Sequence, residues 1–170
     1  MSLEKAGLKD VEELTALVNS AYRGETARLG WTHESDLLRG GVRVTGSDLE
    51  EMISSPDSMI LKYSEGGRIT ACVYLKEYEH YLYLGMLTVS PLLQGRGIGK
   101  MLLREADEQA KSAGKHSIRM TVISRRKELV EWYIRQGYMD TGVREEFPYK
   151  AGYGEPAETL EFLVLEKDIQ

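Results

Sequence analysis

Three strand-like runs follow one another between residues 58 and 89, and this stretch constrains the fold more than any other. They cover about 58–63, 69–78 and 81–89 in the segment SMILKYSEGGRITACVYLKEYEHYLYLGMLTV. The first two are joined at EGGR, a hairpin signal, and the second two near Glu79-His80. Connections this short join antiparallel neighbours. The chain is therefore expected to build a sheet around three antiparallel strands.

Helical patterns precede these strands. The segment DVEELTALVNSAY predicts an amphipathic helix, in which Asp10 and Glu13 have the spacing of a capping box. Ser47 and Glu50 have the same spacing and predict a short helix through Ile53. Between the two helices, residues 23–46 hold five glycines and no sustained period. Long irregular segments of this kind are usually binding loops or disordered.

Helices and strands alternate after residue 97. One helical face ends at Gly114, the strand HSIRMTVI follows, and the helix KELVEWYIRQ is stopped by Gly137. Two more strands are expected around 138–145 and 159–167. We predict an α/β (α+β) fold in which helices flank a mixed, mostly antiparallel central sheet. Its length of 170 residues predicts a single domain over residues 1–170.

Charge, hydropathy and cysteine content limit the kinds of partner and compartment expected for the chain. The formal net charge of −5 argues against general nucleic-acid binding. No apolar run reaches the roughly 18 residues of a membrane span, so no membrane partner is expected. Cys72 is the only cysteine, which excludes an intrachain disulfide and fits the cytoplasm. Its apolar neighbours predict a small buried residue and not a nucleophile. A homodimer stays open.

The segment LLQGRGIGKM, residues 92–101, lies where a strand turns into a helix. It does not fit a P-loop, because Met101 follows Gly99-Lys100 where serine or threonine is required. It does not fit a dinucleotide fingerprint either, because Lys100 occupies the place of the third glycine. Glycines that open a helix still suit an anion, through exposed N–H groups and the helix dipole. A plain tight turn is the alternative.

The surrounding sequence resembles a known family. LGMLTVSPLLQGRGIGKMLL is similar to the acetyl-CoA motif of the GNAT superfamily of N-acetyltransferases: a strand, a small residue and proline, Gln/Arg-x-x-Gly-x-Gly/Ala, and a helix. Downstream, RKELVEWYIRQGY resembles the second family signature, a helix that carries a tyrosine and closes with Gly-Phe/Tyr. The order of the motifs also matches, and the resemblance covers roughly residues 58–140.

The resemblance implies acetyl-CoA as cosubstrate. A bulge in the strand before the loop would free backbone groups for the pantetheine arm, and an N–H of Leu87 or Val89 would polarise the thioester carbonyl. The loop would wrap the diphosphate, mostly through backbone donors. The cofactor-binding residues implied are Leu87, Thr88, Val89, Gln94, Gly95, Arg96, Gly97, Ile98, Gly99, Lys100 and Arg126. Arg126 departs from the family, since many relatives have asparagine there.

Tyr133 is the catalytic residue implied. In the family, a tyrosine four positions before the closing glycine donates a hydrogen bond or a proton to the departing thiolate. A core aromatic is the alternative, because Leu129, Val130 and Ile134 share its helix face. Many relatives also have a glutamate as general base on the strand before the loop. Here no carboxylate lies between Tyr81 and Gln94.

The acceptor is expected to be an amine, bound opposite the cofactor by regions 22–46 and 145–158. The acceptor-binding candidates are Tyr22, Trp31, Glu34, Tyr83 and Phe147. Aromatic rings beside acids such as Glu25, Glu34, Glu145 and Glu146 suit a cationic amine. The base candidates are Tyr83, Glu79, His80, Glu34 and Asp36. The histidines lack metal-ligand spacing, which predicts no metal.

Two functions follow from these patterns. The leading one is transfer of an acetyl group from acetyl-CoA to a primary amine of a small molecule or peptide. The other is a non-catalytic acyl-CoA-binding or sensing module on the same fold. The strand without a carboxylate favours the second function, and Tyr133 favours the first.

Overall fold

The structure is a computed structural model that describes residues 2–23, 38–39, 41–148, 150–156 and 159–169. Its helices are η1 (Leu8–Asp10, a 3-10 turn), α1 (Val11–Tyr22), α3 (Gly46–Ser54), α4 (Ile98–Ser112) and α5 (Lys127–Arg135). Its longer strands are β3 (Ser58–Glu65), β4 (Arg68–Glu77), β5 (Tyr81–Val89), β6 (Ser117–Ile123), β7 (Met139–Glu146) and β9 (Glu161–Asp168). Three short strands are β1 (Ser2–Lys5), β2 (Leu38–Arg39) and β8 (Glu155–Pro156).

Seven strands form one sheet in the order β1-β3-β4-β5-β6-β9-β7. Every neighbouring pair is antiparallel except β5 and β6, which are parallel. β2 and β8 form a separate antiparallel pair. The predicted mixed, mostly antiparallel sheet flanked by helices is thus confirmed. The α4 crossover between β5 and β6 accounts for the single parallel pair, because parallel neighbours need a long connection.

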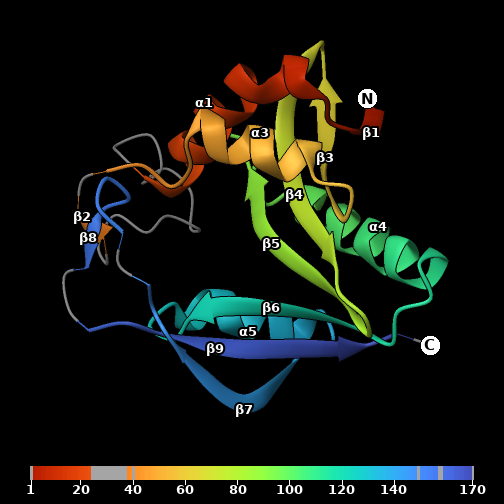
Figure 1. The fold of residues 1–170 in the computed structure, drawn as a ribbon, viewed down its shortest axis with the longest axis vertical. Coiled ribbons are helices and arrows are strands. Elements are labelled where there is room, and N and C mark those ends of the chain that lie inside the picture. Colours follow the sequence, from red (N-terminus) through yellow and green to blue (C-terminus); the bar gives the residue numbers. More distant parts are fainter. Residues whose placement is uncertain (1, 24–37, 40, 149, 157–158, 170) are drawn as a thin grey trace.

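Helices cover both faces of the sheet (Figure 1). On one face, α1 and α3 bury residues such as Leu14, Val18 and Leu49 against alternate residues of β3 and β4, including Ile60. On the other face, α4 and α5 pack on the intervening residues, including Leu61. Strand side chains alternate between faces with a period of two, so both sides of the central strands are apolar. None of the described helices is long and apolar enough to cross a membrane.

The predicted capping box of α1 is wrong. Asp10 makes no side-chain cap on α1; its carboxylate accepts the Gly7 N–H at 2.9 Å and pairs with Lys62 at 3.0 Å. The Glu13 carboxylate reaches the sheet and accepts the Ile69 N–H at 2.7 Å. The sequence spacing was correct for a cap, but both carboxylates find partners elsewhere.

The predicted cap of α3 is also wrong, by two residues. Thr45 is the N-cap: its hydroxyl accepts the Asp48 N–H at 3.1 Å, and the Asp48 carboxylate accepts the Thr45 N–H at 2.9 Å. Ser47 therefore lies within the first turn and does not cap the helix. The two overlapping Ser/Thr-x-x-Asp/Glu spacings cannot be separated by sequence.

β5 separates from β6 along most of its length. The parallel pairing covers only Tyr81–Tyr83 against Ser117–Arg119, and the two strands diverge beyond it (Figure 1). On its other side β5 has a bulge, since Cys72 pairs with Thr88 while Tyr74 pairs with Gly85. Met86, in the bulge, has a positive φ of 53°, which is uncommon for a residue other than glycine. The predicted bulge in the strand before the loop is confirmed.

Candidate active site

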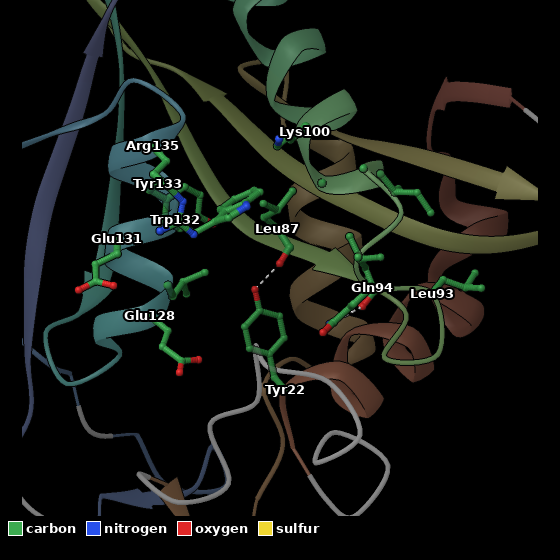
Figure 2. Close-up of a pocket in the computed structure, with 16 residues that line it drawn as sticks. Tyr22, Leu87, Leu93, Gln94, Lys100, Glu128, Glu131, Trp132, Tyr133 and Arg135 are labelled. Carbon is green, nitrogen blue, oxygen red and sulfur yellow. Dashed lines mark hydrogen bonds between the residues drawn. The ribbon is translucent and has the colours of Figure 1, made fainter.

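Two cavities adjoin Tyr133. The first has a volume of about 500 Å³ and lies between α5 on one side and β5, residues 90–97 and α4 on the other. Figure 2 shows the side chains of α5 along one wall and those of the loop along the other. Of the predicted cofactor residues, it is lined by Leu87, Val89, Gln94, Gly95, Gly97, Ile98, Gly99 and Lys100. The bulge and the divergence of β5 from β6 leave β5 backbone groups beyond Tyr83 without a β6 partner beside this cavity.

The loop presents an open helix start to this cavity. Gly97, the N-cap of α4, has φ of 81°, a left-handed conformation that glycine adopts without strain. No side chain caps the helix, and its first turn holds no acidic residue. The first N–H groups of an α-helix lack partners within the helix, and the dipole there favours negative charge. Lys100 adds a cation to the same lining. The geometry suits a phosphate-bearing ligand.

A second cavity of about 360 Å³ lies on the other side of Tyr133. It is lined by residues from α1, β5, β6 and α5 and from the segment that follows β7. The two cavities share four lining residues: Tyr22, Leu87, Leu129 and Tyr133. A ligand in one cavity can therefore meet a ligand in the other only at this junction.

Tyr133 is held at the junction by its neighbours. Its ring makes edge contacts with Trp132 and Tyr138, at centroid distances of 5.0 and 5.9 Å. The side chain is buried. Burial raises the pKa of this hydroxyl well above its usual value, Tyr22 raises it further, and Arg126 lowers it. At neutral pH Tyr133 is therefore protonated and is a hydrogen-bond donor.

Tyr22, at the end of α1, connects this helix to the junction by a hydrogen bond. Its hydroxyl donates a hydrogen bond to the carbonyl of Leu87 (Figure 2). Leu87 follows Met86 in the bulge, so this carbonyl belongs to the part of β5 that is not paired with β6. Tyr22 was predicted to contact the acceptor, and the structure places it in the lining of both cavities.

Three predicted cofactor residues lie outside the first cavity. Thr88 is buried on the other face of β5, where its hydroxyl donates to the Met86 carbonyl at 2.9 Å. Arg96 points to Glu65 at 3.3 Å. Arg126 lines the second cavity, not the first, and its guanidinium lies 5.8 Å from the Tyr22 ring centroid. A backbone contact of Thr88 with the cofactor stays a prediction, as do contacts of Arg96 and Arg126.

The acceptor candidates fall into two groups. Tyr22, Tyr83 and Phe147 line the second cavity. Trp31 and Glu34 lie outside the described residues, as do Glu25 and Asp36. Of the base candidates, Tyr83 is in the second cavity, whereas Glu79 and His80 are on the exposed β4–β5 turn, with side chains 87% and 71% exposed. Glu145 and Glu146 are exposed on β7 and line neither cavity.

Several lining residues were not predicted. On α5 the first cavity is also lined by Glu128, Glu131, Trp132 and Arg135. The second cavity is also lined by Arg23, Arg43 and Lys150, which were not singled out within the expected acceptor regions, and by Tyr153 from the expected region 145–158. The helical signature around Tyr133 could have indicated Trp132, because adjacent positions on α5 border the same cleft. Arg43 and Lys150 carry no motif, and only the folded chain brings them together.

Cys72 is buried, as predicted, and burial raises the pKa of its thiol to about 12. A thiol held protonated in the core is not a nucleophile. Within the described ranges, no three His, Cys, Asp or Glu side chains are grouped so that they could hold a metal ion. The absence of a metal stays a prediction.

The family follows from a comparison with family models. The model described as "Acetyltransferase (GNAT) domain" matches residues 42–149, more than half of the chain. The chain belongs to the GNAT acetyltransferase family. The match spans β5, the glycine-rich loop, α4 and α5, which form both walls of the first cavity. Tyr22 and Arg23 lie before it. A comparison with curated proteins gave no match.

Solved structures agree with the GNAT fold. A GNAT-family acetyltransferase from Streptococcus pneumoniae is 21% identical with a TM-score of 0.71, covering 99% of both chains. The ribosomal-protein-S18-alanine N-acetyltransferase from Escherichia coli is 11% identical with a TM-score of 0.73, covering 99% of this chain and 94% of its own. The yncA protein of Salmonella typhimurium, solved with its cofactor acetyl-CoA, is 16% identical with a TM-score of 0.70, covering 100% and 94%. At these identities the likeness concerns the fold.

Proposed function

We propose that this GNAT domain transfers an acetyl group from acetyl-CoA to a primary amine of a small molecule or peptide by direct attack. The observation that carries the proposal is the junction: Leu87 and Tyr133 line both cavities. Acetyl-CoA in the first cavity and an amine in the second would meet at these residues.

Acetyl-CoA binding is supported by the chemistry of the first cavity. The start of α4 and Lys100 suit the diphosphate, and the unpaired backbone of β5 suits the amide groups of the pantetheine arm. The related yncA structure holds acetyl-CoA, which supports the same cosubstrate here. The thioester would then lie beside Leu87 and Val89, whose N–H groups could stabilise the developing oxyanion.

The reaction forms one C–N bond and breaks one C–S bond. The amine nitrogen attacks the thioester carbonyl carbon, and collapse of the tetrahedral intermediate expels the CoA thiolate. Tyr133 donates its proton or a hydrogen bond to that sulfur, a role that its raised pKa suits because the hydroxyl stays protonated. The ammonium proton leaves through Tyr83 or water, since no described residue lining the second cavity is a carboxylate or histidine.

The second candidate function is an acyl-CoA-binding or sensing module without catalysis. The same lack of a carboxylate in the second cavity favours it. Further proposals are a single domain over residues 1–170, a cytoplasmic location, no metal cofactor and no nucleic-acid or membrane partner; whether the protein forms a homodimer stays open. The full-length coverage of the relatives supports the single domain.

Release of free CoA thiol from acetyl-CoA and a panel of primary amines tests the two functions. We expect amine-dependent release, and Tyr133→Phe should lower kcat about 100-fold with little change in the Kd of acetyl-CoA. Tyr138→Phe is the matched control, because Tyr138 is a buried neighbour whose hydroxyl has no described partner. Acetyl-CoA binding without thiol release for any amine would favour the sensing module. Equal kcat for wild type and Tyr133→Phe across pH would make Tyr133 a core residue.

A further inference from the structure

The second cavity is lined by cations. Four basic residues from four segments of the chain border it: Arg23 after α1, Arg43 before α3, Arg126 before α5, and Lys150 after β7. No aspartate, glutamate or histidine is among its described lining residues. The remaining lining is largely aliphatic and aromatic, for example Met120 and Phe162. Charges of one sign on low-dielectric walls concentrate the field inside a cleft.

Two of these cations flank the junction with the first cavity. The guanidinium carbon of Arg43 lies 5.3 Å from the centroid of the Tyr22 ring, and that of Arg126 lies 5.8 Å from it. Tyr22 in turn is bonded to Leu87, where the thioester would lie. The field of Arg126 reaches Tyr133, since it lowers the pKa of that hydroxyl. Positive charge is therefore close to the reacting atoms.

The basic residues of the second cavity differ in their contacts within the protein. Arg23 is buried and donates to the Tyr153 carbonyl at 2.6 Å, so it fastens the segment after β7 to the end of α1. Arg43 and Lys150 form no ion pair with any described residue. The Arg43 guanidinium contacts the Tyr22 ring and the Lys150 ammonium contacts the Tyr153 ring at 4.9 Å, and the charge of Lys150 also lowers the pKa of Asp48. Such contacts leave guanidinium and ammonium donors available for an anion.

A cationic amine without any acidic group is a poor match for this lining. It would bring a like charge into a cleft that already holds several cations, which is unfavourable in a low dielectric. An amine that also has a carboxylate or phosphate compensates those cations and can form charge-assisted hydrogen bonds with them. The volume of about 360 Å³ is within the usual range for a small-molecule site.

We propose that the acceptor is a small amine that carries an anionic group, which Arg43 and Arg126 bind beside the junction and Lys150 binds at the outer wall. The inference rests on the proposed function and names its substrate class. It replaces the expectation of acidic residues around a cationic amine, since Glu145 and Glu146 lie outside this cavity.

Matched substrate pairs test the inference. Glycine with glycinamide, and β-alanine with its amide, differ in a carboxylate; O-phosphoethanolamine and ethanolamine differ in a phosphate. We expect kcat/KM from thiol release to be at least about tenfold higher for the anionic member in either the carboxylate pairs or the phosphate pair. Loss of one charge-assisted hydrogen bond corresponds to roughly that factor. The type with the larger ratio identifies the anion. Equal rates, or a preference for the neutral members, would overturn the inference.

Variants locate the anion site. Arg43→Gln should raise KM for the anionic member about tenfold more than KM for the neutral member, because only the anion forms a charge-assisted contact with the guanidinium. Lys150→Gln is a second variant on an exposed side chain, should Arg43→Gln fail to fold. Arg144→Gln is the matched control, since Arg144 pairs with Asp140 on β7, outside both cavities. Equal losses for both members of a pair would contradict an anion site.

A binding experiment separates this inference from the proposed function. If no amine releases thiol, the proposed function fails, and calorimetry of the same compounds with the protein in the presence of CoA still decides the anion site. Tighter binding of the anionic members, lost in Arg43→Gln, would support it. Equal or absent binding of both members would overturn it.

Discussion

At the scale of single residues, the two glycines at opposite ends of α4 share a left-handed backbone conformation, but only one of them lines a cavity. Comparing their alanine variants therefore distinguishes backbone strain from loss of a ligand contact. Gly97 and Gly114 have φ of 81° and 70°, and a Cβ added at either would meet no described atom within 4 Å. Gly97 lines the first cavity, whereas Gly114 does not. An alanine at either position pays the cost of a left-handed conformation, about 1 kcal/mol. Only the alanine at Gly97 would also occupy space beside a bound diphosphate.

Gly97→Ala is therefore expected to raise the Kd of acetyl-CoA about tenfold, a loss of roughly 1.4 kcal/mol. Gly114→Ala should lose similar stability with an unchanged Kd. Calorimetry with acetyl-CoA measures the affinities, and thermal melting measures the shared loss of stability. An unchanged Kd in Gly97→Ala would show that the loop does not hold the diphosphate.

Residue patterns predicted the first cavity better than the second. Gln94, Gly97, Gly99 and Tyr133 have fixed spacings, because one loop and one helix supply most of the first site. Arg43 and Lys150 are more than 100 positions apart in sequence, as their numbers show, and neither has a local pattern. Charges near Phe147 were visible in the sequence, but Glu145 and Glu146 lie on β7, a strand whose residues are all exposed. Only the tertiary structure decides which charge faces the ligand.

At the scale of elements, the segment before α3 is packed closely against the segment after β7. A Cβ on Gly41 would lie 2.2 Å from the Gly154 nitrogen and 2.7 Å from the Gly152 carbonyl oxygen. The Val42 N–H donates to that same carbonyl at 3.0 Å. Arg43 and Gly154 both line the second cavity, so the spacing of these two segments sets the shape of its wall.

Gly41→Ala is expected to push these segments apart and to raise the acceptor KM several-fold, with the Kd of acetyl-CoA unchanged. Steady-state kinetics and calorimetry measure the two quantities. Gly66→Ala is the control, because Gly66 also has a positive φ, of 59°, but has open space around it in the β3–β4 turn. An acceptor KM that is equal in both variants would mean that this contact does not shape the second site.

The longer elements were predictable because each has its own period. The expected strands at 58–63, 69–78 and 81–89 match β3, β4 and β5 closely, and the helices at α4 and α5 also match. β1, β2 and β8 were missed. Each has four residues or fewer, too few to establish an alternation, and each is defined only by its pairing partner. Short edge strands are products of tertiary structure.

At the scale of the whole molecule, one buried ion pair joins η1 to the sheet. Asp10 and Lys62 side chains are 9% and 11% exposed. Burial by itself raises the pKa of Asp10, but the hydrogen bond from Gly7 and the charge of Lys62 outweigh it and lower the pKa below its usual value. A lowered folded-state pKa gives stability that is present above the unfolded pKa of about 3.9 and is lost as pH falls through the folded value.

Asp10→Asn should therefore lower Tm at pH 7 by several degrees, since about 1–3 kcal/mol is lost and each kcal/mol corresponds to about 2–4 °C. The difference from wild type should shrink as pH falls below about 4. Thermal melting from pH 7 to pH 3 measures it. Asp140→Asn is the control: its pKa is also lowered, mainly by Arg144, but the pair is exposed and should contribute little. A Tm difference independent of pH would contradict the assignment.

The short parallel pairing of β5 with β6 has a mechanical consequence. Three residue pairs join these strands, against seven between β6 and β9. The sheet therefore has two parts, β1-β3-β4-β5 and β6-β9-β7, that are paired with each other only at one end. At the unpaired end, the hydrogen bond from Tyr22 to Leu87 belongs to the part with β5, and α5 follows β6 in the other part. A molecule that contacts both β5 and α5 adds a second tie across the gap. Its binding energy then also opposes separation of the two parts of the sheet, so bound cosubstrate stabilises the folded state.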